Sequence, residues 1–200
     1  MVDPELASLP EPPRGERRAT LGLLAVTALA SLAMVFTLAR DAAYAFAGDG
    51  VVDLGDLRVA PSASLAANSY ARGTGMLGAS GSIRFERSFE ADTFRIAPVA
   101  GRPDVWVELR VPSGVDPERY VPPPSFTGRL VRFAAAGPRH RGLAGSVTEL
   151  TGQPVPPGAW LLVDGESPAQ SRWVVALVAL FAGFAAWNAI AIARLARRVK

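Results

Sequence analysis

The stretch ATLGLLAVTALASLAMVFTLA, residues 19–39, contains 21 residues and no formal charge. A second stretch of the same length, WVVALVALFAGFAAWNAIAIA at residues 173–193, lies near the other end of the chain. At a rise of about 1.5 Å per residue, each helix would be about 31 Å long, enough to cross the hydrocarbon core of a bilayer. The pattern predicts a membrane protein in which two transmembrane helices flank a domain formed by residues 41–172.

Basic residues beside the two spans predict their orientation. Three arginines precede the first span, and only Arg40 follows it. Only Arg172 directly precedes the second span, whereas residues 194–200 carry four basic side chains. The positive-inside rule therefore places both termini in the cytoplasm: residues 1–18 as a disordered tail and residues 194–200 as a basic tail. The domain at 41–172 is then predicted to be extracytoplasmic, with the chain in the inner (plasma) membrane.

A cleaved signal peptide is the second interpretation of the first span. The sequence AYAFA at residues 43–47 contains two overlapping small-x-small patterns, as signal peptidase sites do. Cleavage there would leave only the C-terminal anchor. Because the apolar run of 21 residues exceeds the roughly 7–15 residues of a signal peptide's hydrophobic region, we predict that the span is retained.

The composition excludes several classes of protein. Residues 41–172 contain 13 Arg and 14 Asp plus Glu, a net charge of −1, so no basic surface indicates nucleic-acid binding. The chain has no cysteine, which excludes disulfides, thiol redox chemistry and cysteine metal ligands. Basic residues are 20 Arg and one Lys, a bias that suggests a bacterium with a GC-rich genome.

Short runs of alternating apolar and polar residues predict an all-β domain, a small barrel or sandwich. Turn residues separate these runs, and the segment 143–150 is predicted to form a short helix over one end of the barrel. The predicted strand segments are 51–54, 57–59, 82–87, 93–99, 105–111, 126–133 and 159–163.

Two motifs resemble ligand sites and lack the required context. Residues 73–78 match GxGxxG, but a loop-like sequence follows them instead of the helix that a dinucleotide site needs. A glycine-rich loop or bulge is the better interpretation. Asp49, Asp53 and Asp56 lie close together, but they lack the ligand density, glycine and closing glutamate of a calcium loop. We interpret these acids as part of a solvated linker.

Candidate catalytic residues are few. His140 is the only histidine, and it lies between Arg139 and Arg141 in a loop bounded by glycine, so we expect it to be exposed. No GxSxG motif accompanies it, and one histidine without cysteine is insufficient for usual zinc catalysis. Glu86 and Glu90 could form an acid pair, but in strand-like sequence they are expected to face solvent beside arginines. We predict no catalytic, cofactor-binding or metal-binding residue and no enzymatic activity.

Three segments resemble the Surfeit-locus (Surf/Shy) family of cytochrome c oxidase assembly proteins. They are FRIAPV at 94–99, VWVELRVP at 105–112 and FTGRL at 126–130, within a two-span topology that the family shares. The family's Asn-Arg-Gly-Trp is replaced by residues 108–111, and its histidine at the start of the second span is absent from residues 170–173. The resemblance therefore implies a scaffold or assembly role and argues against haem binding.

These observations predict a non-enzymatic, membrane-anchored accessory or assembly factor of a bacterial membrane complex. The resemblance implies a respiratory oxidase as that complex. The expected partners are subunits of a membrane protein complex and the lipid bilayer, with no cofactor and no nucleic acid. One alternative is a cell-envelope ligand-binding or sensor module. Another is an envelope hydrolase, which would depend on His140 or on an acid pair.

Overall fold

The computed structural model describes residues 14–48, 50–87, 90, 92–112, 114–115 and 120–197. The chain forms two compact units. One contains most of the two long helices, and the other is Asp41–Arg172.

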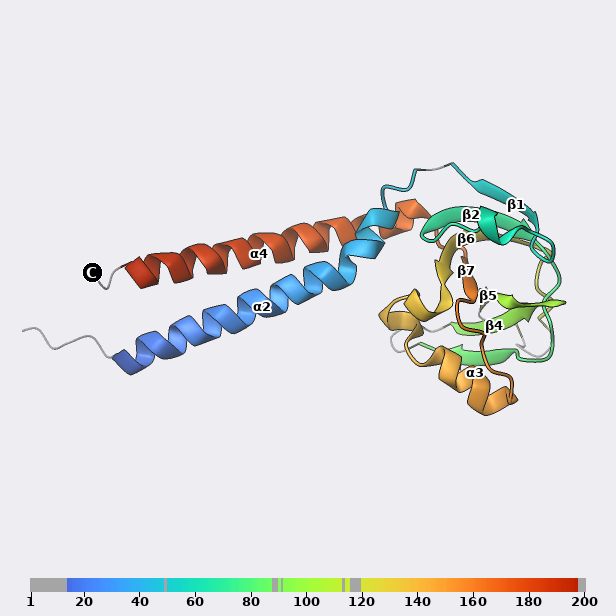
Figure 1. The fold of residues 1–200 in the computed structure, drawn as a ribbon, viewed down its shortest axis with the longest axis horizontal. Helices are drawn as coiled ribbons and strands as arrows, with labels where there is room; N and C mark the ends of the chain where they lie inside the picture. Colours follow the sequence, from blue (N-terminus) through green and yellow to red (C-terminus); the bar gives the residue numbers. More distant parts are fainter. Residues whose placement is uncertain are drawn as a thin grey trace, which may run out of the picture. The chain divides into compact units, whose positions relative to one another are not determined.

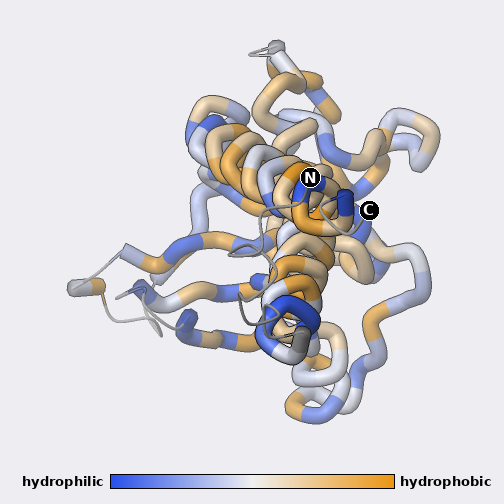
Figure 2. Tube along the Cα trace, turned by 90° about the vertical axis from the view of Figure 1, so that its left-hand side faces the viewer, coloured by the Kyte–Doolittle hydropathy of each residue, from blue (hydrophilic) through white to orange (hydrophobic). Residues whose placement is uncertain are grey.

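Helices α2 (Arg14–Tyr44) and α4 (Arg172–Arg197) are both long and apolar enough to cross a membrane. Figure 2 looks along the two helices from their outer ends and shows hydrophobic colours on their visible turns. Only 6% and 11% of their most apolar windows are buried within the protein, unlike the core helices of a soluble domain. The described parts of both expected tails, residues 14–18 and 194–197, are helical, so the prediction of a disordered segment is wrong for residues 14–18.

Polar groups within the helical unit bond to one another. Asn188, 2% exposed, accepts a hydrogen bond from Thr27 Oγ1 at 3.3 Å and donates to the Phe184 carbonyl oxygen at 2.8 Å. Arg17 donates to the carbonyl oxygen of Leu195 near the end of α4. Since lipid offers no hydrogen-bond partners, such contacts satisfy polar groups that would otherwise be costly in an apolar helix.

The strands described in the second unit form one mixed sheet of seven strands (Figure 1). Its order is β1-β2-β6-β7-β5-β4-β3, in which the β1–β2 and β5–β7 pairs are parallel and the others are antiparallel. An isolated bridge joins Leu77 to Val99, so the segment after β2 meets the end of β4 and the sheet curls toward itself. The strands are β1 (Val52–Asp56), β2 (Ser69–Thr74), β3 (Ile83–Glu86), β4 (Thr93–Val99), β5 (Arg102–Val111), β6 (Ser125–Arg132) and β7 (Trp160–Asp164).

Both faces of the central strands are covered. Val105, Val107 and Leu109 of β5 belong to one apolar core, and Trp106 between them belongs to a second core. Helix α3 (Leu143–Thr151) contributes Leu143 and Val147 to the second core. The predicted helix at 143–150 is therefore present, and it packs against a sheet face. The short 3-10 helices are η1 (Ser62–Ser64), η2 (Phe133–Ala135), η3 (Pro138–His140) and η4 (Pro168–Ser171).

The segments 57–59 and 69–74 differ from the expectation. Residues 57–59 form a turn instead of a strand, and the unpredicted strand β2 extends into the GxGxxG motif. Gly73 lies within β2, and a Cβ atom there would approach the Leu57 side chain to 2.4 Å. The next regular element is strand β3, so the motif lacks the helix of a dinucleotide site. Gly73 instead provides space for the core.

Substitution of Gly128 by alanine is expected to destabilise the domain by at least about 2–3 kcal/mol. A Cβ atom at this position of β6 would lie 1.8 Å from the backbone oxygen of Val163, so β6 and β7 would have to separate. The matched control is Gly145→Ala in α3, where no atom lies within 4 Å and alanine favours the helix. Thermal unfolding of both variants in detergent checks the prediction, and equal midpoints would contradict it.

Candidate functional site

His140 is buried, and the expectation of an exposed loop histidine is wrong. Only 8% of the residue is exposed, because η3 folds its ring against the sheet. Its Nδ1 atom lies 2.8 Å from the carbonyl oxygen of Ala136, and its Nε2 atom lies 2.7 Å from Oε2 of Glu108. Both ring nitrogens therefore have partners within the protein.

Glu108 lies in the middle of β5 and is 2% exposed. Its register partners are Ile96 on β4 and Val163 on β7, which place the carboxylate on the face of the second apolar core. A buried carboxylate requires hydrogen bonds or a counter-ion to offset its lost hydration. Glu108 obtains both, from His140 on one oxygen and from Arg87 on the other.

Arg87 follows the end of β3 and completes the group. Its Nη2 atom lies 2.5 Å from Oε1 of Glu108 and 3.2 Å from Nε2 of His140. Its guanidinium also lies over the ring of Phe94, at 4.1 Å from the centroid, and near the ring of Phe85. Its Nε atom is buried without a hydrogen-bond partner in the described part of the chain. We call Arg87, Glu108 and His140 the buried triad.

The geometry of the buried triad determines where a proton lies. A carbonyl oxygen only accepts, so Nδ1 of His140 carries a hydrogen and donates it to Ala136. At 2.7 Å, Nε2 and the Glu108 carboxylate would repel each other unless a proton lay between them. One proton is therefore shared by Glu108 and His140. In this arrangement both ring nitrogens of His140 are occupied by partners within the protein, Ala136 and Glu108.

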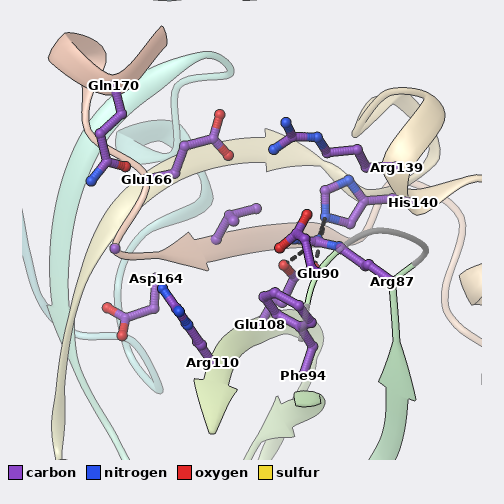
Figure 3. Close-up of a pocket in the computed structure, with 12 residues that line it drawn as sticks. Arg87, Glu90, Phe94, Glu108, Arg110, Arg139, His140, Asp164, Glu166 and Gln170 are labelled. Carbon is purple, nitrogen blue, oxygen red and sulfur yellow. Dashed lines mark hydrogen bonds and ion pairs between the residues drawn. The ribbon is translucent and has the colours of Figure 1, made fainter. Parts of the chain in front are cut away.

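A pocket of about 270 Å³ opens beside the buried triad (Figure 3). In that view Gln170 and Arg139 lie along its upper side, and Asp164 and Arg110 lie along its lower side. The lining carries charges of both signs, and Phe94 and Val163 are the apolar side chains among the described lining residues. A neighbouring hollow shares Arg87, Glu90 and Arg139 and adds Phe85, Glu86, Arg141 and Leu143.

Asp164 at the end of β7 has a perturbed acidity. Its Oδ1 accepts a hydrogen bond from the backbone N–H of Thr127 at 2.8 Å. Burial raises the pKa of its carboxyl group above the ordinary value of 3.8, while hydrogen bonds from the backbone of Thr127 and Gly165 oppose the rise. The folded protein therefore binds this proton more tightly than the unfolded chain does. The Asp164 carboxyl group therefore contributes to the free energy of unfolding below pH 3.8, and this contribution is lost as the pH rises through the raised pKa.

Substitution of Asp164 by asparagine is expected to give a relative gain in stability as the pH rises from 3 to 7. The amide still accepts from Thr127 but has no charge to desolvate. Asp56→Asn is the control of opposite sign, because backbone and side-chain hydrogen bonds from Arg58 lower the pKa of Asp56. Its loss of stability should grow over the same range. Unfolding midpoints at pH 3, 5 and 7 test this, and a falling relative stability of Asp164→Asn would contradict it.

A second polar cluster joins the beginning and the end of the β domain. Arg129 of β6, with a side chain only 9% exposed, binds Asp41 Oδ1 at 2.8 Å and Glu166 Oε1 at 3.1 Å. It also donates to the Asn68 side chain from two nitrogens and lies over the ring of Tyr44 at 4.6 Å. The Tyr44 hydroxyl in turn donates to the Glu166 carbonyl oxygen at 2.7 Å. The last turn of α2 is therefore part of the folded domain.

The other acids considered from the sequence form no such cluster. Glu86 and Glu90 are exposed, as expected, and Glu90 lines both hollows. Asp53 accepts a hydrogen bond from the backbone N–H of Gly55, and Asp56 forms an ion pair with Arg58, so both acids stabilise local turns. Asp49 lies outside the described residues. Among the described residues, no group of three or more histidines or acids could hold a metal ion.

Comparison with known proteins identifies no relative: no family model, curated protein or solved structure matches the chain. The resemblance to the Surfeit-locus family therefore depends on the quoted segments alone and stays a prediction. In the structure those segments form most of β4, β5 and β6, which are the strands that carry Phe94, Glu108 and Arg129.

Proposed function

We propose that this chain is a non-enzymatic, membrane-anchored accessory or assembly factor that presents a β domain to a membrane complex on the extracytoplasmic side. The observation that carries the proposal is the closed geometry of His140. The histidine bonds to Glu108 and to Ala136 through its two nitrogens and is withdrawn from solvent. These contacts of the only histidine support a structural role for it beside the pocket.

Retention of both anchors is supported by the second polar cluster. Cleavage after Ala45 would remove Asp41 and Tyr44 from the domain. Arg129 would then lose its ion pair with Asp41 and its aromatic partner and keep only Glu166 as a counter-ion, and the loss of one partner from a buried ion-pair cluster is destabilising. Tyr44 itself is completely buried. We therefore propose that α2 remains attached and that two spans tether the domain at the bilayer surface.

The test of this function is purification of the tagged full chain in mild detergent. Membrane subunits should co-purify in fixed stoichiometry, because an accessory factor must contact its complex. A tagged unrelated protein with two spans controls for the non-specific capture of membrane proteins. If the full chain migrates alone, or if the same proteins accompany the control, the accessory function is wrong.

A cell-envelope ligand-binding module is the second candidate, and the pocket favours it. A cavity of about 270 Å³ is just below the usual range of roughly 300–1,000 Å³ for small-molecule sites, so it suits a small ligand. The two functions are compatible, since an accessory domain can bind a small molecule as well as a protein.

A further inference from the structure

Three polar side chains that line the pocket have no hydrogen bond or ion pair with another residue in the described part of the chain. They are Glu90, Arg139 and Gln170. The other charges of the lining are largely engaged: Arg87 with Glu108, and Glu166 with Arg129. The pocket therefore offers one free cation, one free anion and one amide among its described residues.

The free charges are complementary but do not form a pair with each other. Arg139 is exposed and forms no ion pair among the described residues, although Glu90 lines the same two hollows. A guanidinium presents a planar fork of donors that matches the oxygens of a phosphate or carboxylate. A carboxylate accepts hydrogen bonds from a protonated primary amine. A molecule that carries both groups could satisfy both side chains at once.

The size and the position of the pocket narrow the ligand further. The pocket that Gln170 lines has a volume of about 270 Å³, which suits a compact polar group, whereas the neighbouring hollow measures about 600 Å³. Gln170 precedes Arg172, the first residue of α4, by two positions, so chain geometry limits their Cα separation to about 7 Å. Along the chain, Gln170 is therefore close to the start of a helix that is long and apolar enough to cross a membrane.

We infer that the pocket binds a small zwitterion composed of an anionic phosphate and a protonated primary amine, the chemistry of phosphoethanolamine. Arg139 binds the phosphate, Glu90 accepts from the amine and Gln170 adds one hydrogen bond. Arg87 is held by Glu108 and His140, so the buried triad fixes the inner wall of the pocket. This inference gives a ligand class to the ligand-binding candidate above. The source of the group is either a lipid headgroup or a free molecule.

Titration of the purified full chain with soluble phosphoethanolamine tests the inference by calorimetry. We expect saturable binding with a Kd on the order of 0.1–1 mM, as suits so small a ligand. Arg139→Ala should weaken binding about tenfold or more, because a charge-assisted contact is lost. Arg141→Ala is the matched control, since Arg141 lines only the neighbouring hollow and should leave the Kd unchanged.

Two related probes test the two halves of the zwitterion. Phosphocholine has no N–H donor and inorganic phosphate has no amine, so both should bind at least several-fold more weakly. Absence of saturable binding, equal binding by either probe, or an Arg139→Ala variant that binds as well as the unaltered chain would overturn the inference. The co-purification of membrane subunits does not depend on any of these outcomes, so the two failures are distinguishable.

Reconstitution in nanodiscs distinguishes the two sources of the ligand. If the ligand is a lipid headgroup, the headgroups of a phosphatidylethanolamine disc will occupy the pocket. Soluble phosphoethanolamine will then bind more weakly to the protein in these discs than to the protein in phosphatidylcholine discs. If a free molecule is the ligand, binding will be equal in both discs. Each result supports the zwitterion site and assigns its source. Loss of binding in both discs, when it is present in detergent, would overturn the inference.

Discussion

Substitution of Glu108 by alanine is expected to destabilise the domain by about 3–5 kcal/mol. The carboxylate, 2% exposed, offsets the charge of Arg87 and shares a proton with His140. Without it, Arg87 remains buried without an anion, which is far more costly than the loss of one surface interaction. Thermal and denaturant unfolding of the full chain in detergent measure the effect.

Two further variants separate the charge effect from the loss of packing. Glu86→Ala removes an exposed carboxylate from the edge strand β3 and should change stability by less than about 0.5 kcal/mol. A triple variant with Arg87→Met, Glu108→Met and His140→Leu removes all the charges together and should regain most of the lost stability. If Glu108→Ala is as stable as the unaltered chain, the buried triad is not the structural unit described here.

Substitution of Arg129 by alanine is the second change with a large expected effect, also about 3–5 kcal/mol. It leaves Asp41 and Glu166 without their shared cation and removes the contact with the Tyr44 ring. The segment at 43–47 should then become sensitive to protease, because local opening exposes the backbone to cleavage. Limited proteolysis followed by mass spectrometry identifies the cut.

Arg129→Lys and Arg72→Ala are the matched controls for this cluster. Lysine keeps the charge but lacks the planar fork that contacts Asn68 twice, so an intermediate loss is expected. Arg72 is exposed on β2. In the described part of the chain its side chain forms one hydrogen bond, to the Thr127 hydroxyl. Its removal should leave the segment at 43–47 protected. Equal protease sensitivity of Arg129→Ala and Arg72→Ala would contradict the role of the cluster.

Local patterns predicted most of the strands because alternation and turn residues act over short distances. Strand β4 has the expected bounds, and β5, β6 and β7 differ from expectation by a few residues. Strand β2 escaped prediction because its sequence SYARGT has little apolar alternation and contains a glycine. Its pairing with β6, which is distant in sequence, stabilises it.

The buried triad could not be assembled from the sequence because its members come from three separate elements. Glu108 occupies an alternate position of β5, and such a pattern usually indicates a solvent-facing side chain. Burial of that face depends on η3 and α3, whose packing positions follow from the tertiary fold. One local signal was present: Glu108 interrupts an otherwise apolar run at 105–109. A charged side chain in such a run needs a polar partner if it is buried, and His140, the only histidine of the chain, was one candidate for that partner.

The central claim, that two spans hold the β domain outside the cytoplasm, is tested most directly by labelling single cysteines. The natural chain has none, so each introduced thiol reports on one position. Gly145→Cys lies on the exposed part of α3, and Arg197→Cys lies at the end of α4. We expect a membrane-impermeant maleimide to label Gly145→Cys in intact spheroplasts and to label Arg197→Cys only after lysis. Labelling of Arg197→Cys in intact spheroplasts with protection of Gly145→Cys would contradict the claim.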